Sequence, residues 1–411
     1  MTQLALNQNA PTKKKTALDL PILIDVFIAL YVVSIYLLSF SSVLNVFSKA
    51  LAFVLMALMG VYMMNKGKLK FGGLFAYFGL FLWVCILSCL WSVNISTSFD
   101  KTITILQLFV LTVLLYNYLS KEKKMPYIIT VLCIAGTIFS VYTVLYFGVD
   151  EYFAGLEEGT RMGGEIANVN TIGLSAAMAM MVSLWKVLYE KKYVYIISAI
   201  ICTVVAFGSG SRKALIFVFM AIILLFILKG NVQKKLWNLI EIAAVLLVLY
   251  FVLKLPVFET VGWRIDSMLN FFKEDGFVDG STNLRMMMID AGWQQFQETP
   301  FTGIGIGNSS YITKQLINKS TYLHNNYIEL LATVGLFGTV FYYLMYVVPF
   351  FSTFKMVAKQ DKYGILAFSL IIIQFVMHYG AVQYYGKINY IYITLFFLVM
   401  DYGKEKFRKN E

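Results

Sequence analysis

The segment PYIITVLCIAGTIFSVYTVLYF, from Pro126 to Phe147, contains no charged residue. A helix of about 20 apolar residues crosses a hydrocarbon core of roughly 30 Å, so this segment predicts a transmembrane helix. The composition agrees, because the 411 residues are 59% hydrophobic and 14% charged, with a mean hydropathy of +0.72. Soluble domains carry about 25% charged residues. The chain is therefore predicted to be a polytopic membrane protein.

Windows of the same kind recur along the chain and predict about twelve transmembrane helices. A helix satisfies its own backbone hydrogen bonds in a bilayer, and the sequence does not repeat the short alternating strands of a membrane barrel. The predicted fold class is an all-α, polytopic transmembrane bundle with a large extracytoplasmic loop that contains short amphipathic helices. The expected spans are Ile22–Phe40, Val46–Met64, Gly72–Trp91, Thr102–Leu119, Pro126–Phe147, Val169–Tyr189, Tyr193–Phe207, Lys213–Leu228, Leu236–Leu253, Asn326–Phe351, Tyr363–His378 and Ile388–Met400.

Lysine clusters fall in every second connection, which is the positive-inside pattern and predicts cytoplasmic termini. The net charge of +11 follows from this asymmetry and from anionic headgroups near the inner surface, so nucleic acid is not expected as a partner. The basic start resembles a signal peptide, but the run from Ile22 is long and no A-x-A-like site follows it, which predicts an uncleaved first helix. The expected division is a cytoplasmic tail (1–21), helices one to nine (22–253), a large extracytoplasmic loop (254–325), helices ten to twelve (326–402) and a cytoplasmic tail (403–411).

Two outer segments are long, Gly148–Asn168 and Lys254–Asn325, and function is expected on that face. In the second, STNLRMMMIDAGWQQFQETP (281–300) has apolar residues at helical spacing and predicts a helix at the membrane interface. FTGIGIGN (301–308) follows, and its alternate glycines, which include Gly303 and Gly305, either let backbone amides approach a phosphate or form a plain turn. The acidic stretch EDGFVDGSTN (274–283) lacks the spacing of a calcium loop and predicts a solvated loop.

Arginines have the opposite distribution to the lysines. Arg161, Arg212, Arg264 and Arg285 lie in predicted outer positions, and Arg408 lies in the cytoplasmic tail. Guanidinium groups bind phosphate bidentately and stay charged at any working pH. Each arginine on its own could pair with a local carboxylate, of which Glu157, Glu158, Asp266 and Asp290 are candidates. The four together predict an anionic ligand at the outer face.

His324, one of two histidines, lies in STYLHNNYIELLATVG (320–335), at the outer lip of a predicted helix. A neutral imidazole there can accept a proton, and the alternative is an interfacial anchor. Glu329 follows inside the helix, where a buried carboxylate is a functional candidate that orients a neighbour or pairs with an arginine. His378 either lines the same cavity or packs at the interface. Cys85 and Cys89 share a helix face without nearby ligands, which favours packing over a metal or redox role.

The ordered motifs RMGGEIANVNTIG, GSGSRKAL, STNLR, ETPFTGIGIGNSSY and HNNYIELLATVGLFG, from Arg161 to Gly338, resemble the bacterial O-antigen ligase and O-antigen polymerase superfamily. The resemblance implies a metal-independent, inverting glycosyltransferase without a cofactor, which takes a glycan from undecaprenyl diphosphate at the outer face of the cytoplasmic membrane. By position, it implies Arg212 and Arg285 as functional arginines and His324 as the essential histidine. Arg161 and Asn170 fall in a weaker upstream motif, where NVN replaces Asn-Pro-Asn. Further expected substrate contacts are Asn325, Glu329, Gly303 and Gly305.

The chemistry of these residue types suits glycosyl transfer. Arginines can stabilise a departing lipid diphosphate, and His324 can deprotonate the attacking hydroxyl. The expected function is a polymerase of surface or capsular polysaccharide; the alternatives are a ligase that transfers finished polymer to lipid A core, protein or cell wall, and a lipid-linked glycan flippase or secondary transporter. Expected partners are the lipid-linked donor, a glycan or lipid-linked acceptor, membrane lipids and other polysaccharide assembly proteins.

Overall fold

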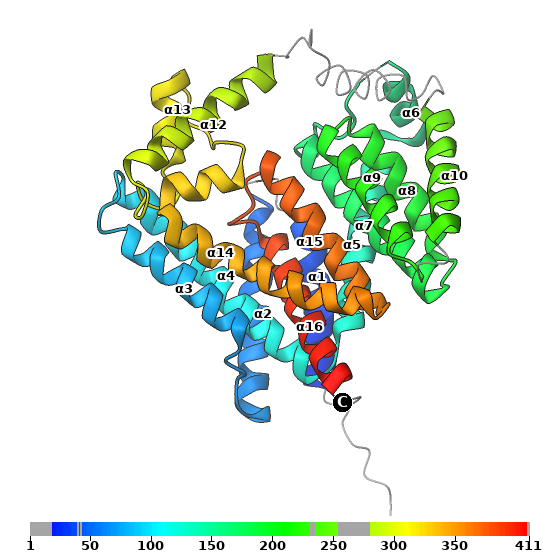
Figure 1. The fold of residues 1–411 in the computed structure, drawn as a ribbon, viewed down its shortest axis with the longest axis horizontal. Helices are drawn as coiled ribbons and strands as arrows, with labels where there is room; N and C mark the ends of the chain where they lie inside the picture. The colour runs from blue at the N-terminus through cyan, green and yellow to red at the C-terminus, as the bar shows by residue number, and fades with distance from the viewer. Residues whose placement is uncertain are drawn as a thin grey trace, which may run out of the picture.

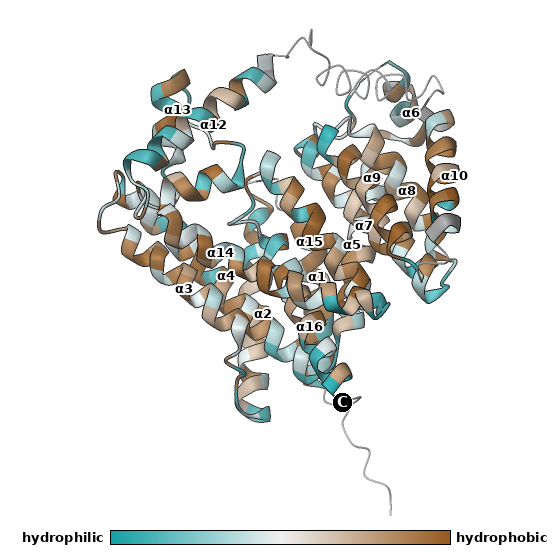
Figure 2. Cartoon of the chain, viewed as in Figure 1, coloured by the Kyte–Doolittle hydropathy of each residue, from teal (hydrophilic) through white to brown (hydrophobic). Residues whose placement is uncertain are grey.

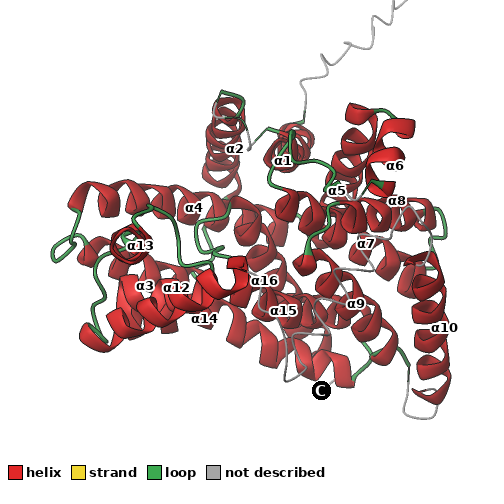
Figure 3. Ribbon diagram, turned by 90° about the horizontal axis from the view of Figure 1, so that it is seen from above, coloured by secondary structure: helices red, strands yellow, loops and turns green. Residues whose placement is uncertain are grey.

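The computed structural model describes residues 19–38, 41, 43–158, 160–230, 235–253 and 280–408. All regular elements in these ranges are α-helices, as Figure 3 shows. Helices long and apolar enough to cross a membrane are α1, α2, α4, α5, α7, α14 and α15. The predicted all-α, polytopic fold class is therefore confirmed. Arg264, Asp266 and the first part of the acidic stretch lie outside the described residues.

Each of the twelve expected spans coincides with a helix. Among the first residues of the helices, the one that differs most from its expected position is in α4, which begins at Ile95 instead of Thr102. The helix begins there because the Asn94 side chain caps it by accepting a hydrogen bond from the Thr97 N–H at 3.2 Å. The helices are α1 (Leu20–Leu37), α2 (Asn45–Lys66), α3 (Gly73–Ser88), α4 (Ile95–Lys121), α5 (Met125–Phe147), α7 (Val169–Glu190), α8 (Tyr195–Gly208), α9 (Arg212–Ile227), α10 (Lys235–Leu253), α14 (Asn326–Ala358), α15 (Lys362–Gly380) and α16 (Lys387–Arg408).

Short helices occupy the two segments predicted to be outside. They are α6 (Val149–Glu157) in the first, and α12 (Gly280–Glu298) and α13 (Ser309–Ile317) in the second. The predicted helix at 281–300 is thus present as α12. It buries Met288 against the protein and leaves Leu284 and Met287 exposed, as an interfacial helix would.

The long helices pack into one bundle (Figure 1). Helix α7 packs on α5, α8 and α9, while α14 packs on α3 and α15 and is crossed by α12. The ribbon is mostly hydrophobic along the helices and hydrophilic at their ends (Figure 2). The starts of α7, α9 and α16 and the ends of α1 and α15 meet at one end of the bundle, because residues of all five line one cavity there. The start of α14 lies at the same end, since Asn326 bonds to the α15–α16 connection.

We expect a cysteine at Ser320 to be labelled from outside intact cells, because this exposed residue lies between α13 and α14 in the predicted outer loop. A cysteine at Lys68, which is exposed between α2 and α3, should be labelled only after permeabilisation. The measurement is reaction with a membrane-impermeant maleimide. Labelling of Lys68→Cys in intact cells, with Ser320→Cys labelled only after permeabilisation, would show that the topology is opposite to the predicted one. Both cysteines are introduced into a variant without Cys89, the native cysteine that is not buried, so that labelling of native cysteines stays low.

Candidate active site

The N-terminus of α9 begins the site. Ser211 caps α9 by accepting from the Ala214 N–H at 3.4 Å, and its own hydroxyl donates to the Asn170 side chain at 3.0 Å. The same Asn170 oxygen accepts from the Arg161 guanidinium at 3.4 Å, and Arg161 also donates to the Ser209 carbonyl at 3.2 Å. Two predicted site residues from the upstream motif, Arg161 and Asn170, are thus tied to the residue before Arg212.

Arg212 and Lys213 are the first two residues of α9 and connect it to other elements. The Arg212 guanidinium donates to the Thr282 hydroxyl at 3.5 Å, which brings it to the first turn of α12. Arg285 is one turn further along α12 and is partly buried. Lys213 donates from its ammonium group to the Gly380 carbonyl at the end of α15. Among the described residues, neither Lys213 nor Arg285 forms a salt bridge with a carboxylate.

His324 stands two residues before α14 in the left-handed backbone region, with φ of 58°. Left-handed backbone at a non-glycine residue costs on the order of 1 kcal/mol or more, and it is found at functional sites. The half-buried ring lies against Tyr322, with 4.2 Å between ring centroids. Burial and the charges of Arg285 and Lys213 lower the pKa of His324 to about 4. The imidazole is therefore neutral at physiological pH and can accept a proton.

Glu329 and Asn325 fix the backbone around His324. Buried Glu329 accepts hydrogen bonds from the Ser309 hydroxyl at 2.5 Å and from the Leu323 N–H at 2.9 Å. It therefore orients its neighbours, which was one of its two predicted roles. Asn325 caps α14 by accepting from the N–H groups of Tyr327 and Ile328 at 2.9 and 3.1 Å. Their predicted contacts with substrate remain predictions.

A cavity of about 430 Å³ adjoins this cluster at the predicted outer end of α1, α7, α9, α15 and α16. Asn170, Lys213 and Tyr322 belong to its wall, whereas Arg161, Arg212, Arg285 and His324 are not among the residues that line it. The lining also includes Gln374, whose buried side-chain oxygen has no partner among the described residues. Amide groups, tyrosine rings and a lysine can together bind hydroxyl groups and an anion.

Gly303 and Gly305 are built into packing contacts. Gly303 lies against the backbone of Thr333, and Gly305 faces Ser92 and Ser98, so a Cβ at either position would collide. The Ile304 N–H donates to the Ala332 carbonyl at 3.0 Å, beside the break in α14 at Gly335. These contacts agree with a plain turn, which was one of the two alternatives for residues 301–308. A contact of Gly303 or Gly305 with substrate remains a prediction.

His378 is fully buried inside the bundle among tyrosines, with its Nδ1 atom 3.4 Å from the Tyr343 hydroxyl. It does not line the cavity, and it packs in the last turn of α15, which agrees with the packing alternative. The four cysteines are unpaired, and the described residues contain no group of three or more His, Cys, Asp or Glu side chains arranged to hold a metal ion.

Residues 197–343 match the family model described as O-antigen ligase. The match confirms the predicted superfamily. The matched segment runs from α8 into α14 and contains Arg212, Arg285 and His324, while Arg161 and Asn170 precede it. The match covers 147 of the 411 residues, and together with the apolar helices it supports a multi-pass membrane protein with a segment similar to O-antigen ligases. A comparison with the curated proteins gives no match.

Two residues of this candidate site, Lys213 and Asn326, were not identified from the sequence. The sequence predicts Lys213 as the first residue of a span. A lysine at a predicted outer end is an exception to the positive-inside pattern, and that exception is the signal in the sequence that marks it. Asn326 ties the α15–α16 connection to α14, because its side-chain oxygen accepts from the N–H groups of Gln383 and Tyr384 at 2.8 and 3.1 Å. That contact joins residues far apart in the chain and left no local signal.

Proposed function

We propose that this protein is a surface-polysaccharide polymerase, which transfers an undecaprenyl-diphosphate-linked glycan to an acceptor hydroxyl at the outer face of the bacterial cytoplasmic membrane. The observation that carries the proposal is an arrangement of cations beside His324: Lys213 shares a cavity wall with Tyr322, which lies against the His324 ring, and Arg212 is hydrogen-bonded to the first turn of the helix that carries Arg285. Burial first, and then the charges of Arg285 and Lys213, lower the pKa of His324. Fixed cations suit a diphosphate, and a histidine kept neutral suits a base. The O-antigen ligase match supports the general reaction.

In the proposed reaction the acceptor oxygen attacks the anomeric carbon of the donor sugar and forms the new glycosidic bond. The bond from that carbon to the diphosphate oxygen breaks, and its electron pair leaves with the lipid diphosphate. The acceptor proton passes to the His324 imidazole. Arg212, Lys213 and Arg285 stabilise the negative charge that develops on the leaving group. Attack from the face opposite the diphosphate inverts the anomeric centre, and in this proposal no metal ion takes part.

Glycans of a deletion strain test the proposal directly. Loss of a polymerase should leave single lipid-linked repeat units at the outer face. Full-length polymer that is not attached to its final acceptor would instead indicate a ligase, and repeat units confined to the cytoplasmic face would indicate a flippase. The measurement is mass analysis of lipid-linked and surface glycans. Unchanged glycans would reject all three functions in that organism.

We expect a low acid limit for catalysis. The pKa of about 4 belongs to His324 in the free protein, and a base acts only in its deprotonated form, above its pKa. The value of kcat/KM should therefore fall only below about pH 5. The acid limit of kcat should lie at a higher pH than that of kcat/KM, because a bound diphosphate offsets the charges of the cations and raises the pKa of His324 in the complex. Lys213→Met should move the kcat/KM limit upward. The measurement is a pH profile with purified protein, and a wild-type kcat/KM limit near pH 6.5 would contradict this assignment.

A further inference from the structure

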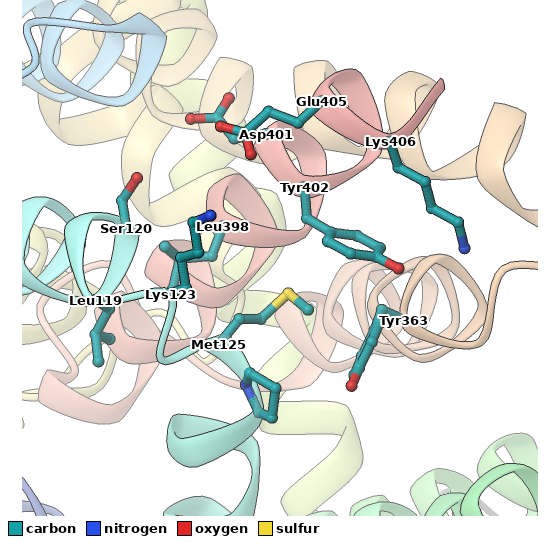
Figure 4. A pocket seen from close by; sticks show the side chains of 11 residues that line it. Leu119, Ser120, Lys123, Met125, Tyr363, Leu398, Asp401, Tyr402, Glu405 and Lys406 are labelled. Atoms are coloured by element: carbon teal, nitrogen blue, oxygen red, sulfur yellow. The ribbon is translucent and has the colours of Figure 1, made fainter. Parts of the chain in front are cut away.

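A second cavity lies at the opposite end of the bundle from the candidate active site. Its volume is about 370 Å³, and it is bounded by the end of α4, the turn into α5, the start of α15 and the last turns of α16 (Figure 4). These are the ends that the lysine pattern assigns to the cytoplasm. Nothing in the proposed transfer reaction uses this cavity.

The walls of this cytoplasmic cavity are amphipathic. Leu119, Met125 and Leu398 are buried behind the wall, while Pro126 and the half-buried rings of Tyr363 and Tyr402 form its accessible apolar part. The two rings are in edge contact, with 5.3 Å between centroids. Charged side chains gather around the same space in Figure 4. An apolar wall below a charged rim, at the end of transmembrane helices, matches the boundary between acyl chains and headgroups.

The rim carries both signs of charge. Lys123, held by a left-handed backbone with φ of 53°, forms no ion pair with a carboxylate among the described residues. Asp401 accepts from the Tyr116 hydroxyl, and its one ionic partner among the described residues is Lys404, at 3.8 Å. Glu405 has no ion pair with a described cation. Lys406 is already engaged with Asp361 at 2.7 Å, so it neutralises neither acidic group.

We propose that this cavity binds the headgroup of a phospholipid that carries both a phosphate and a primary amine, from the cytoplasmic leaflet. Lys123 and the Ser120 hydroxyl face the phosphate, and Asp401 and Glu405 face the ammonium group. An acyl chain continues along Pro126 and the rings of Tyr363 and Tyr402, which are the accessible apolar and aromatic parts of the wall. A purely anionic lipid fits less well, because its headgroup would meet two carboxylates without a cation to pair with them.

Lipid retention on the full-length protein tests the proposal. We expect native mass spectrometry, after addition of lipid to detergent-solubilised protein, to show phosphatidylethanolamine retained over phosphatidylglycerol and over phosphatidylcholine, which has no N–H donors. Lys123→Met and Glu405→Gln should each weaken retention of phosphatidylethanolamine about tenfold, the effect of one lost charge-assisted hydrogen bond. The matched control is Lys68→Met, an exposed lysine in another predicted cytoplasmic connection.

Three results would overturn the proposal. They are equal retention of phosphatidylethanolamine and phosphatidylglycerol, wild-type retention by both cavity variants, and an equal loss in Lys68→Met. Thermal unfolding of each variant separates a lost site from a lost fold, because both substituted side chains are exposed and should leave the transition unchanged. Glycerophosphoethanolamine, which has the headgroup without acyl chains, should compete poorly; effective competition would assign the cavity to a soluble ligand instead of a lipid.

Discussion

His324→Gln should lower turnover by about 10²- to 10⁴-fold, the usual contribution of a general base. Glutamine keeps hydrogen-bonding capacity but cannot take up a proton at neutral pH. The ring lies outside α14 and is half-buried, so the variant should insert and fold. Donor binding should persist, because Arg212, Lys213 and Arg285 are unchanged. The measurement is the initial rate per folded molecule with a purified lipid-linked glycan.

The other histidine supplies the control for this result. His378→Gln changes a fully buried ring in the tyrosine cluster, which has no part in the proposed chemistry. Its effect should appear in folding yield, with a rate per folded molecule within about threefold of wild type. If His324→Gln also stays within about threefold, His324 is an interfacial anchor and the proposed mechanism is wrong.

The helices could be predicted from the sequence because each depends on a local property. A continuous apolar window predicts a helix, and all twelve expected windows coincide with a helix, of which seven among the described residues are long and apolar enough to cross a membrane. Their ends were less predictable. Helix α4 begins at Ile95 because of a single cap from Asn94, and that cap precedes the apolar run by several polar residues.

The site was only partly predictable because its residues meet through long-range contacts. Arg212, Arg285 and His324 were found through motifs, but the contact between Arg212 and Thr282 spans elements far apart in sequence. Gly303 was expected either near a phosphate or in a plain turn, and its close contact with the backbone of Thr333 is one that only the folded chain creates. Glu329 illustrates the same point. A buried carboxylate could be recognised as special from sequence, but its bonds to Ser309 and Leu323 could not.

Arg285→Lys should lower turnover about 10²- to 10³-fold, although it keeps the positive charge. A guanidinium binds two phosphate oxygens through a planar fork, whereas an ammonium group acts as a point charge on a flexible stem. The conservative change therefore separates geometry from charge. Because the cation near His324 remains, the acid limit of kcat/KM should move little, and the loss should appear in kcat. The measurement is the same assay at saturating donor, across the pH range.

The matched control is Arg408→Lys, at the end of α16 on the predicted cytoplasmic side, which should be neutral. Activity of the wild type should survive EDTA, because fixed cations supply the charge that Mg²⁺ supplies in many soluble transferases. Two outcomes would count against the arginine clamp. In the first, Arg285→Lys retains near-wild-type turnover, so that simple charge suffices at this position. In the second, chelated wild type is inactive and added divalent metal restores it, so that the metal would be the principal partner of the leaving diphosphate.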